Sequence, residues 1–123
     1  MQHTAIQLGV RVCAWASLAV IVLLSLLPSD AVVRTGAGGK LEHGVAYLGA
    51  SFLVAMAYGT MARVIAGLFL CAGVLEVLQT FSPGRTPSLL DFAGSASGIV
   101  LGVALAAMIR WRIRPMDHSK GTD

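Results

Sequence analysis

The polar side chains that could do chemistry in this chain are few, and they fall in its central part. They are Lys40, His43, Tyr47, Glu76, Gln79, Arg85, Asp91 and Ser95. Lys40, His43 and Tyr47 are spaced i, i+3 and i+7, so on a helix they share one face, and the spacing of Asp91 and Ser95 has the same effect. This set combines cations, carboxylates, an imidazole and an amide, groups that bind polar head groups or transfer protons.

These side chains are expected at one end of several apolar segments. At about 1.5 Å per helical residue, Tyr47, Glu76 and Ser95 lie roughly 6 to 9 Å inside the ends of their segments, which predicts one shared pocket. A carboxylate in hydrocarbon is costly unless it is neutral, paired or wetted. Lys40, His43 and Arg85 are expected at the same end, so they are the available partners for Glu76.

The composition places the chain in a membrane. Apolar residues make up 56% of its 123 residues and charged residues only 12%, whereas a soluble domain has about 25% charged residues. A single small domain could not cover its surface with so few charges. The net charge of +3 comes from scattered cations without a basic stripe, so no nucleic acid partner is expected.

Four apolar segments are each long enough to cross about 30 Å of hydrocarbon as a helix. The third segment is interrupted by Glu76 and Gln79, which we interpret as a polar interior face. The sequence therefore predicts an all-α, polytopic four-helix bundle that forms one domain over residues 1–123. The transmembrane helices are expected at about 10–28, 43–62, 64–81 and 91–110.

The distribution of cations predicts the orientation. Six cations are expected at one end of the bundle and three at the other, which places both termini in the cytoplasm of a bacterial inner membrane. The six are Arg11, Arg63, Arg110, Arg112, Arg114 and Lys120, and the three are Arg34, Lys40 and Arg85. The first segment could instead be a signal peptide cleaved near Ala31, but its apolar core is longer than usual.

Two motifs in the last segment have structural interpretations. Gly94, Gly98 and Gly102 form a small-xxx-small stripe, which is typical of close helix packing within one bundle or between paired bundles. Ser88-x-x-Asp91 has the spacing of a helix capping box with Asp in place of Glu. Capping by Asp91 and ligand contact are compatible.

The chain has no pattern that predicts a metal or a cofactor. Cys13 and Cys71 lie inside apolar runs, where cysteine behaves as a small hydrophobic residue. His3, His43 and His118 are expected on opposite sides of the membrane, which gives no metal-ligand spacing.

The ordered set of polar residues resembles the VanZ-like family of small bacterial membrane proteins. The matching pattern is Lys40-x-x-His43-x-x-x-Tyr47, then Glu76-x-x-Gln79, then Pro83-Gly84-Arg85, then Asp91 followed by Gly98 and Gly102. The resemblance covers about residues 39–102. The family usually has Asn four residues after the Asp, where this chain has Ser95. The resemblance implies a role in the cell envelope and a link to susceptibility to the glycopeptide teicoplanin.

Three functions are compatible with these features. In the first, the shared pocket lies on the outer side of the membrane, opposite the cytoplasmic termini, and binds a cell-envelope precursor or another anionic lipid head group. In the second, the chain is a membrane enzyme for a lipid-linked substrate, with Glu76 and His43 as general acid and base. In the third, it is a small transporter or an accessory subunit whose polar cluster serves assembly.

Overall fold

The computed structural model describes residues 2–31, 36, 38–86 and 88–113 of the chain. The described residues form four α-helices and one short 3-10 helix, which confirms the all-α class. Arg34, Arg114, Lys120 and His118, which entered the sequence-based predictions, lie outside the described residues. The elements are α1 (Gln2–Leu26), α2 (Gly39–Tyr58), α3 (Ala62–Leu78), η1 (Gln79–Phe81) and α4 (Leu89–Arg112).

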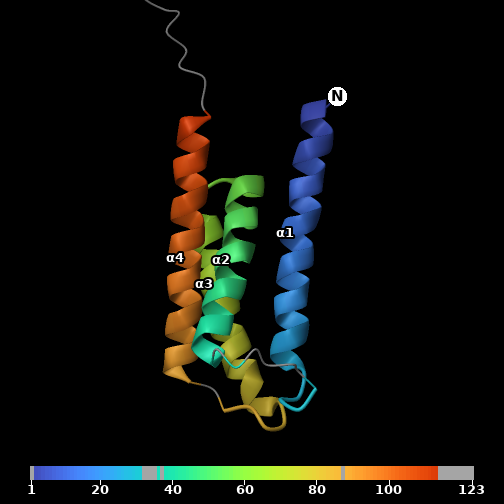
Figure 1. Ribbon diagram of the computed structural model, residues 1–123, viewed down its shortest axis with the longest axis vertical. Coiled ribbons are helices and arrows are strands. Elements are labelled where there is room, and N and C mark those ends of the chain that lie inside the picture. Colours follow the sequence, from blue (N-terminus) through green and yellow to red (C-terminus); the bar gives the residue numbers. More distant parts are fainter. Residues whose placement is uncertain (1, 32–35, 37, 87, 114–123) are drawn as a thin grey trace, which may run out of the picture.

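The four helices run alternately up and down along one axis (Figure 1). The start of α1 and the end of α4 lie at the same end of the bundle, together with the α2–α3 hairpin; we call this the terminal end. The opposite end holds the α1–α2 and α3–α4 connections, and we call it the loop end. The most extensive packing joins α2 to α4, whereas α1 packs mainly on α2 and α3 mainly on α4.

Three of the helices are long and apolar enough to cross a membrane, which indicates a small multi-pass membrane protein. They are Thr4–Leu26, Ala62–Phe81 and Leu89–Arg112. The predicted span at 43–62 corresponds to α2, which is not among these three helices. Its first turns carry Lys40, Glu42 and His43, which reduce the hydropathy of a helix of 20 residues. The structure therefore supports three of the four predicted spans.

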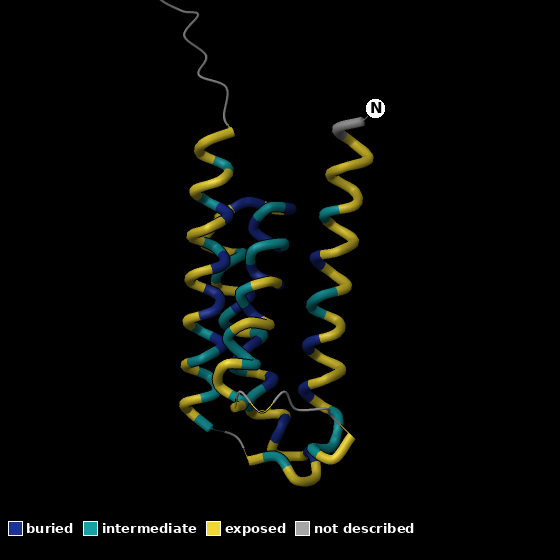
Figure 2. The backbone as a smooth tube through the Cα atoms, viewed as in Figure 1, coloured by how far each residue is buried: buried dark blue, intermediate teal, exposed yellow. Residues whose placement is uncertain are grey.

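Exposed positions recur along the helices (Figure 2), and many of them carry large apolar side chains. Examples are Ile6, Trp15, Leu70, Leu101 and Trp111, all of which are exposed. A soluble protein rarely exposes so much contiguous apolar surface, but hydrocarbon is a favourable solvent for it. The interior is small, with Tyr47 and Ile99 as its largest fully enclosed side chains.

The glycine stripe of α4 faces the backbone of α2. A Cβ atom at Gly94 would lie 2.5 Å from the carbonyl oxygen of Lys40, and Cβ atoms at Gly98 and Gly102 would overlap carbonyl groups of α2 in the same way. Ser51 of α2, fully buried at this contact, donates its hydroxyl hydrogen to the carbonyl of Gly98 at 3.4 Å. The two helices therefore approach backbone to backbone, as small-xxx-small patterns allow.

Side chains at the terminal end connect α2 to its neighbours. The Arg110 guanidinium donates to the carbonyl of Met56 at 3.0 Å, in the last turn of α2 where backbone acceptors have no helical partner. The indole N–H of Trp15 donates to the Tyr58 hydroxyl at 2.7 Å, and the Arg11 guanidinium lies 5.6 Å from the centre of the Tyr58 ring. These contacts fix the end of α2 between α1 and α4.

Candidate functional site

The start of α4 is capped by a side chain from another helix. The Ser88 hydroxyl accepts the backbone N–H of Leu90 at 3.2 Å, as expected of an N-cap residue. In a capping box, Asp91 would accept the backbone N–H of Ser88. Here the Glu76 carboxylate accepts that N–H at 2.6 Å, so α3 provides the second half of the cap. The Asp91 carboxylate is consequently not used for capping.

Arg85 stabilises the end of α1. Its Nε donates to the carbonyl of Leu27 at 3.2 Å, and its Nη2 donates to the carbonyl of Leu24 at 2.6 Å. The Ser82 hydroxyl donates to the carbonyl of Leu26 at 2.7 Å. The last carbonyls of a helix lack helical partners and carry partial negative charge, so a guanidinium is favourable there. Arg85 pairs with this helix end, and it forms no ion pair with Glu76 or Asp91.

A tight turn holds Arg85 in this position. The backbone N–H of Arg85 donates to the carbonyl of Ser82 at 3.1 Å, with Pro83 and Gly84 between them. Gly84 has a positive φ of 74°, which glycine adopts without the steric cost that other residues meet. The turn is also joined to the α1–α2 connection, because the N–H of Ser29 donates to the carbonyl of Pro83 at 3.2 Å. The Pro83-Gly84-Arg85 motif therefore docks the α3–α4 loop on α1.

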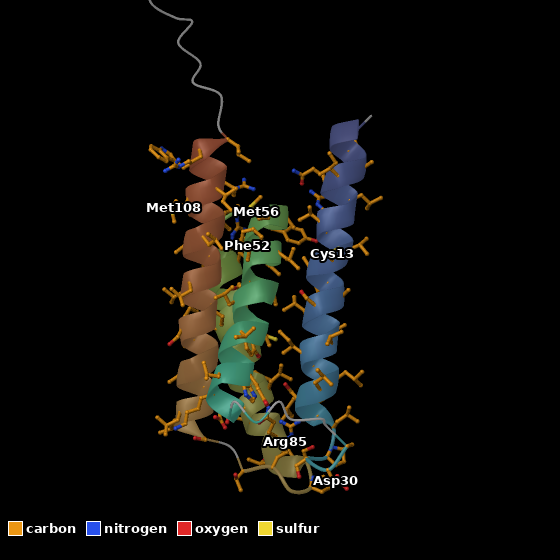
Figure 3. The ribbon with its side chains drawn as sticks, viewed as in Figure 1. Cys13, Asp30, Phe52, Met56, Arg85 and Met108 are labelled. Carbon is orange, nitrogen blue, oxygen red and sulfur yellow. The ribbon has the colours of Figure 1, made fainter. Side chains whose placement is uncertain are left out.

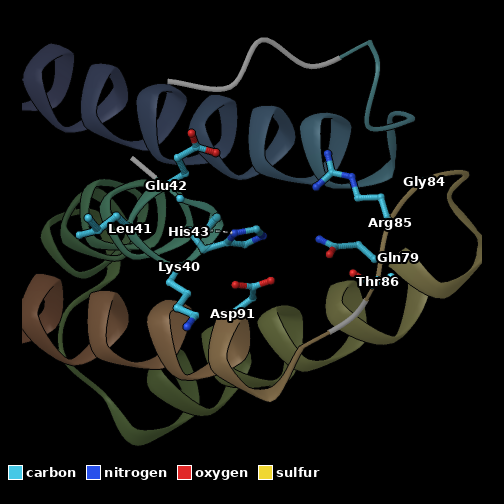
Figure 4. A pocket seen from close by; sticks show the side chains of 11 residues that line it. Lys40, Leu41, Glu42, His43, Gln79, Gly84, Arg85, Thr86 and Asp91 are labelled. Carbon is cyan, nitrogen blue, oxygen red and sulfur yellow. Dashed lines mark hydrogen bonds between the residues drawn. The ribbon is translucent and has the colours of Figure 1, made fainter. Parts of the chain in front are cut away.

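A cavity of about 500 Å³ opens at the loop end, between the start of α2, the 3-10 helix η1, the following loop and the start of α4 (Figure 4). Five of the residues predicted for the pocket line this cavity. The other described lining residues are their neighbours Gly38, Gly39, Leu41, Glu42, Gly84 and Thr86. The five are Lys40, His43, Gln79, Arg85 and Asp91. The structure thus brings together polar groups separated by about half of the chain.

The other three predicted residues are not among those that line the cavity. Tyr47 is only 2% exposed and belongs to the interior of the bundle. Glu76 is half-buried and engaged with Ser88. Ser95 is buried, and its hydroxyl donates to the backbone carbonyl of Asp91 at 3.1 Å rather than to the Asp91 carboxylate.

His43 is held in one orientation. Its Nδ1 lies 2.7 Å from the carbonyl oxygen of Gly39, one turn earlier in α2. A carbonyl oxygen can only accept, so Nδ1 carries the hydrogen, and in the neutral imidazole Nε2 is left as an acceptor. The ring extends from this bond into the cavity (Figure 4).

Asp91 lies at the start of two helices. It is in the first turn of α4, and a Cβ atom at Gly39 would lie only 3.5 Å from its Oδ1, so the carboxylate also adjoins the first turn of α2. No side chain caps α2 at Gly38, and the dipole of that helix favours a negative charge there. Among the described residues, the Asp91 carboxylate forms no hydrogen bond and no ion pair.

Gln79 is a buried residue whose amide has no hydrogen-bond partner among the described residues. Its side chain is 4% exposed and lines the cavity, and the amide makes no hydrogen bond to any part of the chain that the structure describes. Figure 4 shows the amide group directed toward the space beside His43. The amide nitrogen and oxygen are not fully enclosed, so they are available to a molecule in the cavity.

The described part of the chain contains no group of three or more His, Cys, Asp or Glu residues arranged for a metal ion. Cys13 and Cys71 are free thiols. The chain matches no protein-family profile, no curated protein and no solved structure.

Proposed function

We propose that this chain is a bacterial inner-membrane protein whose loop-end cavity faces outward and binds the polar head group of an envelope lipid or a lipid-linked envelope precursor. The observation that carries this proposal is the cavity of about 500 Å³ lined by Lys40, His43, Gln79 and Asp91 at one end of an apolar bundle. A site at the end of a membrane bundle is within reach of head groups while acyl chains pack on the apolar surface.

In this proposal α2 also crosses the membrane, which makes four spans in total, and both termini are cytoplasmic. The antiparallel order of α1, α2, α3 and α4 supports four crossings, because the start of α1 and the end of α4 lie at the same end of the bundle (Figure 1). The described cations support the orientation: Arg11, Arg63, Arg110 and Arg112 belong to the terminal end, whereas Lys40 and Arg85 belong to the loop end.

Cysteine accessibility tests this orientation. In a background that carries Cys13→Ala and Cys71→Ala, a cysteine at position 40 should react with a membrane-impermeant maleimide in intact cells. A cysteine at position 63 should react only after the membrane is opened. Labelling of position 40 only in opened cells would overturn the outward orientation.

We also propose kinship with the VanZ-like family. Six residues of that pattern line one cavity, namely Lys40, His43, Gln79, Gly84, Arg85 and Asp91. Because that family is linked to teicoplanin susceptibility, this chain should lower susceptibility when it is overproduced in a sensitive host. Unchanged teicoplanin susceptibility in a strain with verified membrane expression would contradict this part of the proposal.

Native mass spectrometry of the protein extracted in mild detergent tests the head-group function. The wild-type protein should retain a lipid in a fixed ratio, and Asp91→Asn and His43→Ala should reduce the retained fraction by about tenfold, as loss of a charge-assisted hydrogen bond predicts. Asp30→Asn is the matched control, because Asp30 is exposed at the same end of the bundle (Figure 3). Equal retention in Asp91→Asn and the wild type would overturn the proposal.

One observation favours a second candidate, a membrane enzyme acting on a lipid-linked substrate. His43 is fixed through Nδ1, with Nε2 free to accept a proton from a molecule in the cavity, as a general base requires. Asp91 is then a better carboxylate partner than Glu76, whose oxygen is occupied by the Ser88 N–H. Turnover of a lipid-linked substrate that is lost in His43→Gln but retained in Glu76→Gln would favour this candidate.

A further inference from the structure

We propose that the head group recognised in the loop-end cavity is a hydroxylated one, a glycerol or a sugar, and not a bare anion. This inference rests on the proposed function and specifies its ligand. It follows from three features of the cavity wall. Arg85 donates its hydrogen bonds to the end of α1, several side chains of the wall accept hydrogen bonds, and the amide of the buried residue Gln79 faces the cavity.

The cavity has little excess positive charge for a bare anion. Arg85 is the only guanidinium among the described lining residues, and it donates through Nε and Nη2 to the last carbonyls of α1. Figure 4 shows that group directed toward α1. The Asp91 carboxylate adds a negative charge to the same lining as Lys40. An anion would therefore meet the exposed Lys40 but also the half-buried Asp91 carboxylate.

The wall is instead rich in acceptors. The His43 Nε2, the Asp91 carboxylate and the carbonyl oxygen of Gln79 all accept hydrogen bonds, and they come from three different helical segments around one space. Their ligand must therefore bring donors. The Gln79 amide also presents an N–H₂ donor, so the best complement is a group that both donates and accepts, which a hydroxyl does.

Hydroxyl groups fit this wall better than an ammonium group does. An ammonium would lie near Lys40 and near the positive end of α2, which starts at Gly39 in the same wall. A hydroxyl is neutral and avoids both repulsions, while it can donate to Asp91 or His43. A phosphate that links the hydroxylated group to its lipid can remain at the mouth beside the exposed Lys40.

The burial of Gln79 gives this inference its sharpest support. Gln79 as a whole is only 4% exposed, so its side chain is held in place with the amide at the cavity surface, where a ligand hydroxyl can bond to it. The amide reaches the open space of the cavity, because no side-chain nitrogen or oxygen of the described residues is fully enclosed without a partner. Gln79 should therefore discriminate between head groups with and without hydroxyls.

The test is a lipid competition measured by native mass spectrometry on the full chain in mild detergent. The probes are phosphatidylglycerol, phosphatidic acid and a glucosyl diacylglycerol with identical acyl chains. The wild-type protein should prefer phosphatidylglycerol to phosphatidic acid by about tenfold, the factor expected for one good hydrogen bond in a desolvated site, although phosphatidic acid is the more highly charged lipid. Binding of the glucosyl lipid above phosphatidic acid would support a sugar as the source of the hydroxyls.

Variants separate the hydroxyl preference from general lipid binding. Gln79→Ala, Gln79→Met and Asp91→Asn should each reduce the preference for phosphatidylglycerol over phosphatidic acid to about one. Gln79→Met keeps a side chain of similar volume, so it replaces Gln79→Ala if that variant does not fold. Thr80 is exposed, does not line the cavity and donates its hydroxyl hydrogen to the carbonyl of Val77 at 2.7 Å. Thr80→Ala therefore controls for loss of a polar group next to Gln79, and Asp30→Asn controls for loss of a nearby charge. Both variants should keep the preference. Lys40→Ala should weaken both phospholipids equally.

Two outcomes overturn the inference and differ in their meaning. Saturable binding in which phosphatidic acid equals or exceeds both hydroxylated lipids would overturn the choice of ligand but leave head-group binding in place. Binding of all three lipids that is unsaturable and insensitive to Lys40→Ala and Asp91→Asn would overturn the proposed function together with this inference.

Discussion

The Glu76 carboxylate and the backbone N–H of Ser88 are joined by a 2.6 Å hydrogen bond across α3 and α4. Through this bond a side chain of α3 completes the N-cap of α4. The bond also holds together the two ends of the loop that connects these helices. Asp91, the residue that has the capping-box spacing, is left for the cavity.

This bond predicts a graded effect of substitution at Glu76. Glu76→Ala should lower the free energy of unfolding by about 1 to 3 kcal/mol, because it leaves a half-buried donor without a partner. Glu76→Gln keeps an acceptor oxygen and should cost less. The measurement is thermal unfolding in detergent followed by circular dichroism, with Thr80→Ala as the control. Equal losses in the Gln and Ala variants would show that the charge, and not the acceptor, is required.

Close packing of α2 and α4 predicts a strong effect of one methyl group. Gly98→Ala places a Cβ against the carbonyl of Gly44, so the unfolding midpoint should fall, with a loss of about 1 to 3 kcal/mol expected for overpacking.

The matched control is Gly67→Ala on α3, where a Cβ would have no neighbour within 4 Å. That variant should be neutral or slightly stabilising, because alanine favours the helical state over glycine. Similar midpoints for the two variants would contradict the close approach of the backbones.

Docking of the α3–α4 loop on α1 predicts a local change in Arg85 variants. Arg85→Ala should speed backbone hydrogen exchange at the end of α1 and in the following loop, since the carbonyls of Leu24 and Leu27 lose their partner. Arg85→Lys should have an intermediate effect, because an ammonium cannot reproduce the fork of two N–H donors. Arg63→Ala, an exposed cation at the terminal end, is the control. Unchanged exchange in Arg85→Ala would exclude this role.

The orientation of His43 predicts a tautomer. In its neutral form the imidazole should carry its hydrogen on Nδ1, because that atom faces the carbonyl of Gly39 at 2.7 Å. Long-range ¹⁵N–¹H correlation spectra of ¹⁵N-histidine-labelled protein, assigned with His43→Gln, distinguish the two tautomers. A spectrum in which neutral His43 carries its hydrogen on Nε2 would contradict the fixed ring.

The gathering of the cavity residues could be predicted because it follows from helical periodicity. Lys40 and His43 share a face near the start of α2, and Asp91 lies in the first turn of α4, so antiparallel helices bring them to one end. The apolar lengths likewise predicted the class and three of the four spans. For α2, the same polar residues that form the site reduce its apolar length.

The partners of Arg85 and Glu76 could not be predicted in this way. Both side chains bond to backbone groups, one to the carbonyls of Leu24 and Leu27 and the other to the N–H of Ser88. Nearly every residue has such backbone groups, so the residue types in a sequence do not indicate which backbone group a side chain will bond to. Side-chain charge suggested ion pairs instead, which the described residues do not form at these positions.

The attachment of the cavity wall to α1 makes the site sensitive to the bilayer itself. Arg85 and Thr86 belong to a loop anchored on α1, whereas the opposite wall belongs to the tightly joined pair α2 and α4. A long apolar helix responds to a thinner or thicker membrane by changing its tilt. Because α1 packs on α2 but has little contact with α4, a change in its tilt would move the Arg85 loop relative to the start of α4, so hydrophobic mismatch would alter the shape of the cavity.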